Sequence, residues 1–214
     1  MSWNSKKSAA QTPSYAEIVA KNYGEYTKAQ QKTLQNSKVL VVGVGGDGGW
    51  VAHFLGRIGV GNITIVDNDT VEPSNINRQC FATVPGIGKK KVGIGRQMIN
   101  DINPNIKVKA YDLHVSEKNA HKIIQGHDIV VQCFDDWLSR IIIHRTARKM
   151  KIPVVSQTGR PPFRLWITSF FPESPDFEKV MNMPTRNLSI DELKKKQRFA
   201  KTMGSKTCCY VWRV

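Results

Sequence analysis

Four glycines follow a short apolar run in the first quarter of the chain, and together they could cradle a phosphate group. The segment reads Lys38-Val-Leu-Val-Val-Gly-Val-Gly-Gly-Asp-Gly48. Glycine lets the backbone turn tightly and approach a phosphate, and the free N–H groups at the start of a following helix attract its negative charge. The candidate nucleotide-binding residues of this segment are Gly43, Gly45, Gly46 and Gly48.

Polar and charged side chains further along the chain complete a possible nucleotide site. Asp67 lies about twenty residues past the glycines, where a carboxylate accepts hydrogen bonds from ribose hydroxyls. On these features alone NAD and ATP are equally good ligands. The next candidates are Asn75, Arg78, Gln79 and Lys91. Because Arg and Lys stabilise the charge that grows on phosphoryl oxygens, they favour phosphoryl or nucleotidyl transfer over hydride transfer.

Two adjacent aspartates, Asp135 and Asp136, follow a later apolar run. Ligands of open α/β sheets bind at the carboxyl ends of parallel strands, where these residues are expected. A carboxylate that faces a polyphosphate would repel it unless a cation lay between them, so we predict a magnesium ion on one of these aspartates. One of the two aspartates could instead cap the helix expected to begin at Trp137.

Alternating strands and helices must position these candidates. The expected strands are 39–42, 63–67, 107–111, 129–133 and 154–156, and the expected helices are 48–58, 89–102, 117–124 and 137–150. Short β-branched runs separated by helices indicate βαβ crossovers and a parallel sheet that is covered on both faces. The predicted fold class is therefore α/β, with a doubly wound, mostly parallel, Rossmann-like sheet and helical appendages at both ends.

Three segments are expected along the chain. Residues 1–26 form a leader and N-terminal segment, of which 1–14 are expected to be mobile; residues 27–171 form the nucleotide-binding domain; and residues 172–214 form a divergent C-terminal loop and helix. Within the last two, helices are expected to start after Thr27 and Ser189, which have capping-box spacing, and residues 165–171 to form a strand.

Composition limits the class of protein. The 214 residues carry a formal net charge of +15, which attracts polyanions without choosing among nucleotide, tRNA and acidic protein. The sequence lacks both an apolar run long enough to span a bilayer and a secretory signal, so a cytoplasmic protein without membrane partners is expected. Its four cysteines form no CxxC pair, and no zinc is expected.

The motifs together strongly resemble those of the ThiF/MoeB/HesA family of ubiquitin-like-protein activating enzymes. The resemblance covers roughly residues 27–168 and rests on Gly43-x-Gly-Gly-x-Gly, Asp67-x-Asp69-x-Val71, Ser74-Asn75-x-Asn77-Arg78-Gln79, Gly88-x-x-Lys91 and Asp135. It implies binding of Mg-ATP and adenylation of a carboxylate, commonly the C-terminus of a small sulfur-carrier or ubiquitin-like protein or a peptide, with release of pyrophosphate. It also implies a homodimer.

The resemblance assigns roles to single residues. Asp67 would hold the ribose, Asp135 the magnesium ion, and Asn75, Arg78, Gln79 and Lys91 the phosphates. The expected catalytic residues are Arg78, Lys91 and Asp135. Arg78 and Lys91 are expected to affect the rate more than the affinity, because they meet the charge of the transition state best.

Five features depart from the family pattern. Asp47 lies within the glycine segment, where relatives usually have a small or apolar residue, and Lys21 stands where many relatives have an arginine that reaches phosphates across a dimer interface. The paired CxxC motifs are absent, and so is an obvious counterpart of the catalytic cysteine, for which Cys208 and Cys209 are the only nearby candidates. Relatives also continue beyond this C-terminus, so a truncated or specialised form is expected.

Three other functions remain open. An ATP-dependent tRNA threonylcarbamoyladenosine dehydratase of the same superfamily would use the basic surface to bind tRNA. A non-catalytic ATP-binding partner subunit would explain the missing cysteine region. An NAD-dependent oxidoreductase fits the cationic residues least well.

Overall fold

Six strands form one sheet at the centre of the fold, in the order β3-β2-β1-β4-β5-β6. The computed structural model describes residues 12–160 and 164–202. The strands are β1 (Lys38–Val42), β2 (Asn62–Val66), β3 (Lys107–Tyr111), β4 (Ile129–Gln132), β5 (Val154–Arg160) and β6 (Arg164–Phe170). Neighbouring strands are parallel except β5 and β6, which are antiparallel. The predicted fold class, a doubly wound, mostly parallel sheet, is confirmed.

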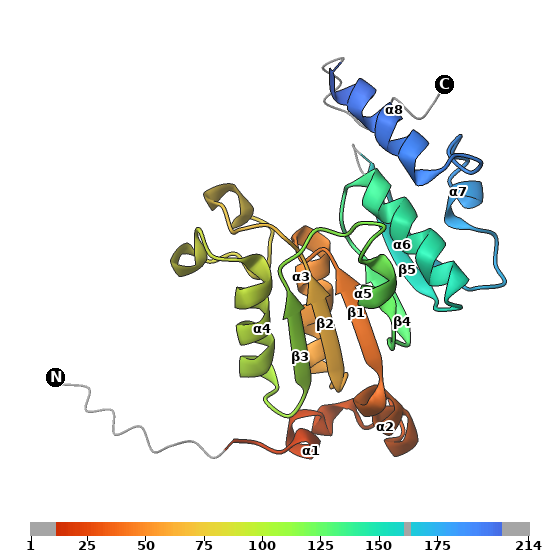
Figure 1. Ribbon diagram of the computed structural model, residues 1–214. Helices are drawn as coiled ribbons and strands as arrows, with labels where there is room; N and C mark the ends of the chain where they lie inside the picture. The colour runs from red at the N-terminus through yellow and green to blue at the C-terminus, as the bar shows by residue number, and fades with distance from the viewer. Residues whose placement is uncertain (1–11, 161–163, 203–214) are drawn as a thin grey trace.

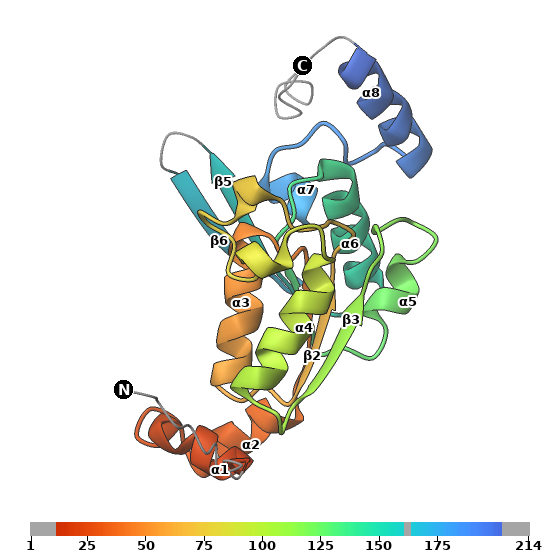
Figure 2. The ribbon, with the colours of Figure 1, turned by 90° about the vertical axis from the view of Figure 1, so that its left-hand side faces the viewer.

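Helices cover both faces of the sheet (Figure 1, Figure 2). One face carries α3 (Gly46–Arg57) and α4 (Lys91–Ile102), and the other carries α5 (Ala120–Ile124) and α6 (Trp137–Lys149). Successive residues of a strand point to opposite faces, so β1 supplies two cores. Val39 and Val41 belong to the first core, and Leu40 and Val42 to the second. This double burial explains why the strand is apolar without interruption.

The other helical segments lie at the ends of the chain and in its connections. They are α1 (Tyr15–Ile18), α2 (Lys28–Asn36), α7 (Phe177–Val180), α8 (Ile190–Thr202) and the short 3-10 turns η1 (Ala20–Asn22), η2 (Pro73–Asn75) and η3 (Val84–Gly86). The predicted capping boxes are present. The Thr27 hydroxyl accepts a hydrogen bond from the Gln30 N–H at 3.2 Å, and the Ser189 hydroxyl accepts one from the Glu192 N–H at 3.3 Å.

Several element boundaries differ from the predictions, and backbone pairing explains one of them. The helix predicted from residue 89 begins at Lys91, because Thr70 and Lys90 form an antiparallel bridge and Val71 donates its N–H to the Lys89 carbonyl at 2.9 Å. Strand β5 extends beyond the predicted 154–156, because it pairs with β6 as far as Arg160. The helix predicted from residue 48 already begins at Gly46, and the one predicted from residue 117 begins only at Ala120.

The N-terminal segment contains two short elements that the sequence analysis missed, α1 and η1. Ser14 caps α1 in a box with Glu17, and the Tyr15 hydroxyl donates to the Gly59 carbonyl at 2.6 Å, which ties the segment to the end of α3. Most of the predicted mobile leader, residues 1–11, lies outside the described residues.

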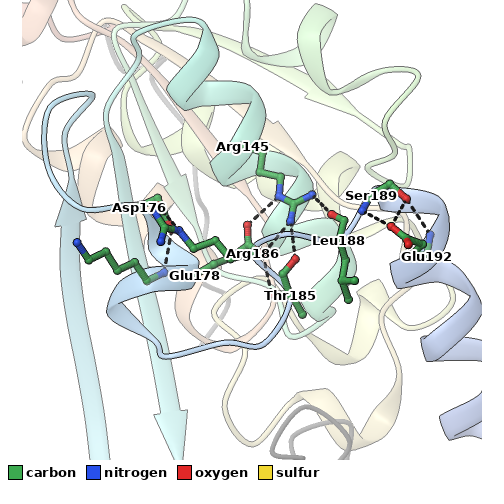
Figure 3. Close-up of polar contacts among 9 residues, drawn as sticks. Arg145, Asp176, Glu178, Thr185, Arg186, Leu188, Ser189 and Glu192 are labelled. Atoms are coloured by element: carbon green, nitrogen blue, oxygen red, sulfur yellow. Dashed lines mark hydrogen bonds and ion pairs between the residues drawn. The ribbon is translucent and has the colours of Figure 1, made fainter.

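Residues 172–185, predicted to be a loop, hold α7, which packs against α6 through a largely buried ion pair (Figure 3). Arg145 of α6 donates from Nε and Nη2 to the two carboxylate oxygens of Glu178, at 2.7 and 2.9 Å. The same guanidinium donates to the carbonyls of Thr185 and Leu188, and the Thr185 hydroxyl donates to Glu178 at 2.6 Å. These contacts hold the chain that leads into α8.

Across the described residues, no helix is long and apolar enough to cross a membrane.

Candidate functional site

A cavity of about 1130 Å³ opens at the carboxyl ends of β1, β2 and β4. Nine of the ten predicted site residues line it: Gly43, Gly45, Gly46, Asp67, Asn75, Arg78, Gln79, Lys91 and Asp135. The tenth, Gly48, packs behind the glycine loop. The structure thus brings the predicted residues together at one end of the sheet, while the role of each in binding or catalysis remains a prediction.

Two glycines are required by the shape of this loop. Gly43 has a φ of +84°, which favours glycine, and a Cβ there would lie 2.8 Å from the Cβ of Phe134. A Cβ at Gly48 would lie only 1.8 Å from the carbonyl oxygen of Gly43. The loop and the first turn of α3 therefore touch backbone to backbone, and Gly48 supports the cavity without lining it.

The start of α3 offers backbone donors to an anion. Gly45 is its N-cap residue and has no side chain that could accept a hydrogen bond from the first turn. The first N–H groups of a helix have no partner within the helix, and its dipole adds partial positive charge at this end. A helix that starts uncapped at the wall of a cavity can bind a phosphate group there.

Asp67, at the end of β2, holds the glycine loop and still has acceptor capacity. One carboxylate oxygen accepts the Val44 N–H at 2.8 Å, and the other accepts the Asp69 N–H at 2.8 Å. An ionised carboxylate has about four acceptor positions, so lone pairs remain for hydroxyl groups of a ligand. This geometry fits the predicted ribose contact.

Lys91 is a buried cation in the wall of the cavity. Its side chain is 7% exposed, and its ammonium group lies 2.8 Å from the carboxylate of Asp69, which is 60% exposed. A buried charge needs a partner, and an exposed carboxylate can move away at low cost. A phosphate group could therefore replace Asp69 as the partner of Lys91.

The segment around η2 presents the remaining predicted residues. Arg78 is exposed, and its Nη1 donates to the Ser74 carbonyl at 2.8 Å and to Asn77 Oδ1 at 3.0 Å. Asn75 is buried, and its Oδ1 accepts the Glu72 N–H at 3.1 Å. The amide of Gln79 lies beside Gly45. This segment thus faces the glycine loop across the cavity.

The two adjacent aspartates have different environments, and one of them caps a helix as the sequence suggested. Asp136 is the N-cap of α6 and accepts the Ser139 N–H at 2.9 Å. Asp135 is exposed in the cavity and forms no hydrogen bond or ion pair within the described part of the chain. Asp47, in the first turn of α3, is also exposed and lines the cavity, so its carboxylate is solvated.

The lining of the cavity is acidic, although the whole chain is strongly basic. Six carboxylates line it (Asp47, Asp67, Asp69, Glu72, Asp135 and Asp136), against the three cationic side chains of Arg78, Lys90 and Lys91. This surplus of carboxylates repels a polyphosphate, and added cations reduce the repulsion. Magnesium binds through one or two carboxylates together with substrate phosphates, so the residues present fit a phosphate-bound magnesium ion. No group of three or more potential metal ligands occurs among the described residues.

The two cysteines near the cavity are not activated nucleophiles. Burial, and secondarily the charge of Asp47, raises the pKa of the Cys133 thiol to about 12. Burial also raises the pKa of Cys80, whose sulfur lies 3.4 Å from His53 Nδ1. Arg57 donates to His53 Nε2 at 2.7 Å, so that imidazole cannot accept the thiol proton there. Cys208 and Cys209 lie outside the described residues.

The sequence analysis missed part of the lining. The chain after β3, Leu113–Val115, borders the cavity, and so do Lys90 and Trp50. The segment after β3 could have been found, because β3 pairs with β2 and its carboxyl end must lie at the same edge of the sheet. Trp50 offered no such signal, since an aromatic residue in a helix is usually part of the core.

Comparison with known proteins gives consistent relatives. The ThiF family profile matches residues 19–169. The adenylyltransferase and sulfurtransferase UBA4 of Saccharomyces cerevisiae is 40% identical over 131 residues, which are 61% of this chain and 30% of that protein. The chain therefore spans less than a third of the length of this relative.

Solved structures agree with the same assignment. The tRNA N6-threonylcarbamoyladenosine dehydratase TcdA of E. coli, solved in complex with ATP, has a TM-score of 0.66 and 29% identity, covering 67% of this chain and 60% of that one. E. coli MccB, solved with MccA-N7isoASN, has a TM-score of 0.64 and 25% identity, covering 69% of this chain and 44% of that one. The resemblance inferred from the motifs is confirmed: this chain belongs to the ThiF family.

Proposed function

We propose that this protein is an ATP-dependent adenylyltransferase that activates a carboxylate and releases pyrophosphate. One observation carries the proposal: a single cavity joins an uncapped helix start, a buried lysine with a displaceable partner, an exposed arginine and an exposed aspartate. A hydride-transfer site has no use for these cations and this exposed aspartate. Membership of the ThiF family and the name of the UBA4 relative support the same reaction.

In the proposed reaction, an oxygen of the substrate carboxylate attacks the α-phosphorus of ATP. A new P–O bond forms, the bond between the α-phosphorus and the bridging oxygen breaks, and pyrophosphate leaves with the electron pair. The N–H groups at the start of α3 would bind the phosphates, and Asp67 would accept the ribose hydroxyls. The protein thus fixes the reacting groups in one geometry, which is a large part of the rate enhancement.

Lys91 and Arg78 would act on the departing pyrophosphate. Its negative charge rises as the bond breaks, and positive side chains placed beforehand stabilise that charge without rearrangement of water. Lys91 would exchange its ion pair with Asp69 for one with a phosphate oxygen. Asn75 and Gln79 would donate hydrogen bonds from their amide groups to phosphate oxygens.

A magnesium ion held by Asp135 would supply Lewis-acid charge to the phosphate oxygens. Asp135 suits this role because no group within the described part of the chain competes for its carboxylate. The acidic lining gives a second reason, since an added cation would offset its repulsion of ATP and tighten binding.

The proposed substrate is the C-terminal carboxylate of a small carrier protein or a peptide. The UBA4 relative is named as a sulfurtransferase as well as an adenylyltransferase, and a small carrier would serve both activities. We further propose that the protein acts in the cytoplasm as a homodimer, as the family resemblance implies. A dimer would show in sedimentation as twice the monomer mass.

Substrate-dependent exchange of pyrophosphate into ATP tests the proposal, screened against carrier-protein tails, short peptides and tRNA. Asp135→Ala is expected to abolish the exchange while the circular dichroism spectrum stays unchanged. Asp101→Ala, at an exposed position of α4 away from the cavity, is the matched control and should retain full exchange. Undiminished exchange in Asp135→Ala would remove the assignment of this residue.

A second candidate is a tRNA-modifying dehydratase, favoured by the similarity to TcdA and by the net charge of +15. Binding to tRNA would then weaken steeply with salt, because each neutralised phosphate releases counterions. Tight ATP binding without exchange on any substrate would instead favour a non-catalytic partner subunit. Nicotinamide fluorescence should show no binding of NADH.

A further inference from the structure

A buried chain of hydrogen bonds runs beneath Asp135. The Ser156 hydroxyl of β5 donates to Oε1 of Gln132 at 2.5 Å, and Nε2 of Gln132 donates to the Phe134 carbonyl at 2.9 Å. That carbonyl also accepts Nη2 of Arg140 from α6, at 2.8 Å. The three polar side chains are at most 4% exposed. This series of hydrogen bonds therefore links β4, β5 and α6, and two of its bonds end on the Phe134 carbonyl oxygen.

Gln132 is an unusual residue for its position. It is the last residue of β4, in the interior of the sheet, where its Cα pairs with Val42 of β1 on one side and Ser156 of β5 on the other. Other residues at this depth, such as Leu40 and Val130, are apolar. A buried amide costs stability unless all its hydrogen bonds are made, and an apolar side chain of similar volume would often serve stability equally well. The hydrogen-bonded amide thus calls for an explanation other than stability.

The backbone held by these hydrogen bonds lies between Asp135 and the glycine loop. Phe134, whose carbonyl is held twice, is followed by the exposed Asp135 and then by Asp136, the N-cap of α6. On its other side, Phe134 touches the glycine loop, since a Cβ at Gly43 would lie 2.8 Å from the Phe134 Cβ. The position of the Phe134 carbonyl therefore determines where Asp135 lies relative to the loop.

We propose that Gln132 is a positioning residue for the metal and nucleotide site. Gln132 is not one of the described residues that line the cavity. It acts by fixing the turn at Phe134, which sets the place of Asp135 against Gly43. Ser156 orients the amide by donating to its oxygen, so that its NH₂ group faces the carbonyl. This inference rests on the proposed function, because it assumes that Asp135 binds the magnesium ion of Mg-ATP.

Two substitutions separate positioning from packing. Gln132→Glu keeps the shape and the acceptor for Ser156, but an ionised carboxylate cannot donate to the Phe134 carbonyl and repels it. Gln132→Met keeps most of the volume without either hydrogen bond. Both leave every residue of the cavity lining unchanged, so any effect on ligand binding is transmitted through the turn.

The test compares ATP affinity in magnesium chloride with ATP affinity in EDTA, by calorimetry on the full chain. Wild-type protein should bind ATP more tightly with magnesium. Outer residues that orient metal ligands typically contribute about tenfold to a hundredfold in metal affinity. We expect Gln132→Glu and Gln132→Met to lose about tenfold of the magnesium-dependent gain, with unchanged affinity in EDTA and faster hydrogen exchange at residues 133–136.

The outcomes are distinct. If the wild type gains affinity from magnesium and both variants keep the full gain, the positioning role of Gln132 is wrong while the proposed function stands. If the wild type does not bind ATP even with magnesium, both proposals fail. Where Gln132→Glu does not fold, Gln132→Met carries the comparison, since an apolar side chain at this depth leaves no unsatisfied charge.

Discussion

Helix α6 borders two cavities, and they treat their polar groups differently. At its N-terminal end the 1130 Å³ cavity leaves donors and acceptors open: the uncapped start of α3, the exposed Arg78 and the exposed Asp135. At its C-terminal end a second cavity of about 510 Å³ is also lined by charged residues, but Arg145 and Glu178 are engaged with each other and with Thr185 (Figure 3). Spare hydrogen-bonding capacity, and not the number of charges, distinguishes the proposed binding site from the structural contact.

His144, which also lines the second cavity, is likewise engaged with other residues of the protein. It is buried, its ring stacks on Phe177 at 4.1 Å between centroids, and it meets Phe170 nearly edge to face at 4.9 Å. Its Nε2 has no hydrogen-bond partner among the described residues. Burial, and secondarily the charge of Arg140, lowers the pKa of His144 to about 3, so the ring is neutral. The contacts of the His144 ring at this cavity are therefore with other aromatic rings of the protein.

The buried ion pair gives the largest expected effect on stability. Glu178→Ala removes the partner of a largely buried Arg145, and breaking such a pair typically costs about 3–5 kcal/mol. Urea unfolding should show a loss near the lower end of this range, because the Arg145 side chain is 26% exposed. Mg-ATP affinity should not change. Arg186→Ala, which breaks an exposed pair with Asp176, is the control and should cost less than about 1 kcal/mol.

The glycine loop gives the next largest effect on stability, and here the substitution should also reduce nucleotide binding. Gly48→Ala places a Cβ against the Gly43 carbonyl oxygen, and overpacking of this kind costs about 1–3 kcal/mol. It should also abolish Mg-ATP binding, because the phosphate loop must shift. Gly46→Ala, with nothing within 4 Å of the added Cβ, should leave stability unchanged or higher. Equal losses from both substitutions would contradict the backbone contact.

Acid should weaken the second region through His144. Because its folded pKa of about 3 lies below the unfolded value of 6.5, the unfolded state binds the extra proton between these two pH values. The contribution of neutral His144 is complete above pH 6.5 and declines by about 1.4 kcal/mol per pH unit as the pH falls. His144→Phe should therefore flatten the dependence of unfolding free energy on pH between 6.5 and 4. An unchanged slope would show that another group dominates.

The smallest expected effect is at Asp69. Asp69→Asn removes the charge that pairs with the buried Lys91 but keeps an amide oxygen that can accept a hydrogen bond from its ammonium group, so the loss of stability without ligand should be smaller than that of Glu178→Ala. Mg-ATP should then bind more tightly, since no carboxylate competes for Lys91. The shift of the melting temperature by Mg-ATP should exceed that of the wild type. A smaller shift would mean that Asp69 itself takes part in binding.

Much of the first region could be predicted from the sequence because local signals specify it. The residues before Gly43 are continuously apolar, and the glycines, Asp67 and Asp135 all lie at or soon after the ends of parallel strands. The rule that these ends share one edge of the sheet then places them together. The loss of a Cβ at Gly43 and Gly48 has a steric reason that the structure confirms.

The second region could not be predicted, because it depends on contacts between segments far apart in the sequence. Arg145 and Glu178 are 33 residues apart, and nothing local to either residue indicates the pair. The proline-punctuated stretch that holds α7 reads as a loop, since a four-residue helix leaves no periodic pattern. The role of Gln132 was equally hidden, because its partners lie on β5 and α6.

Calorimetric titration with ATP in the presence of magnesium tests the central claim most directly: that the cavity at the strand ends is a metal-dependent triphosphate site. Saturable binding to the wild type is predicted, with strong weakening in Asp135→Ala, a smaller loss in Lys91→Ala and none in Arg186→Ala. Absence of binding by the wild type, or equal affinity in all four proteins, would contradict the account.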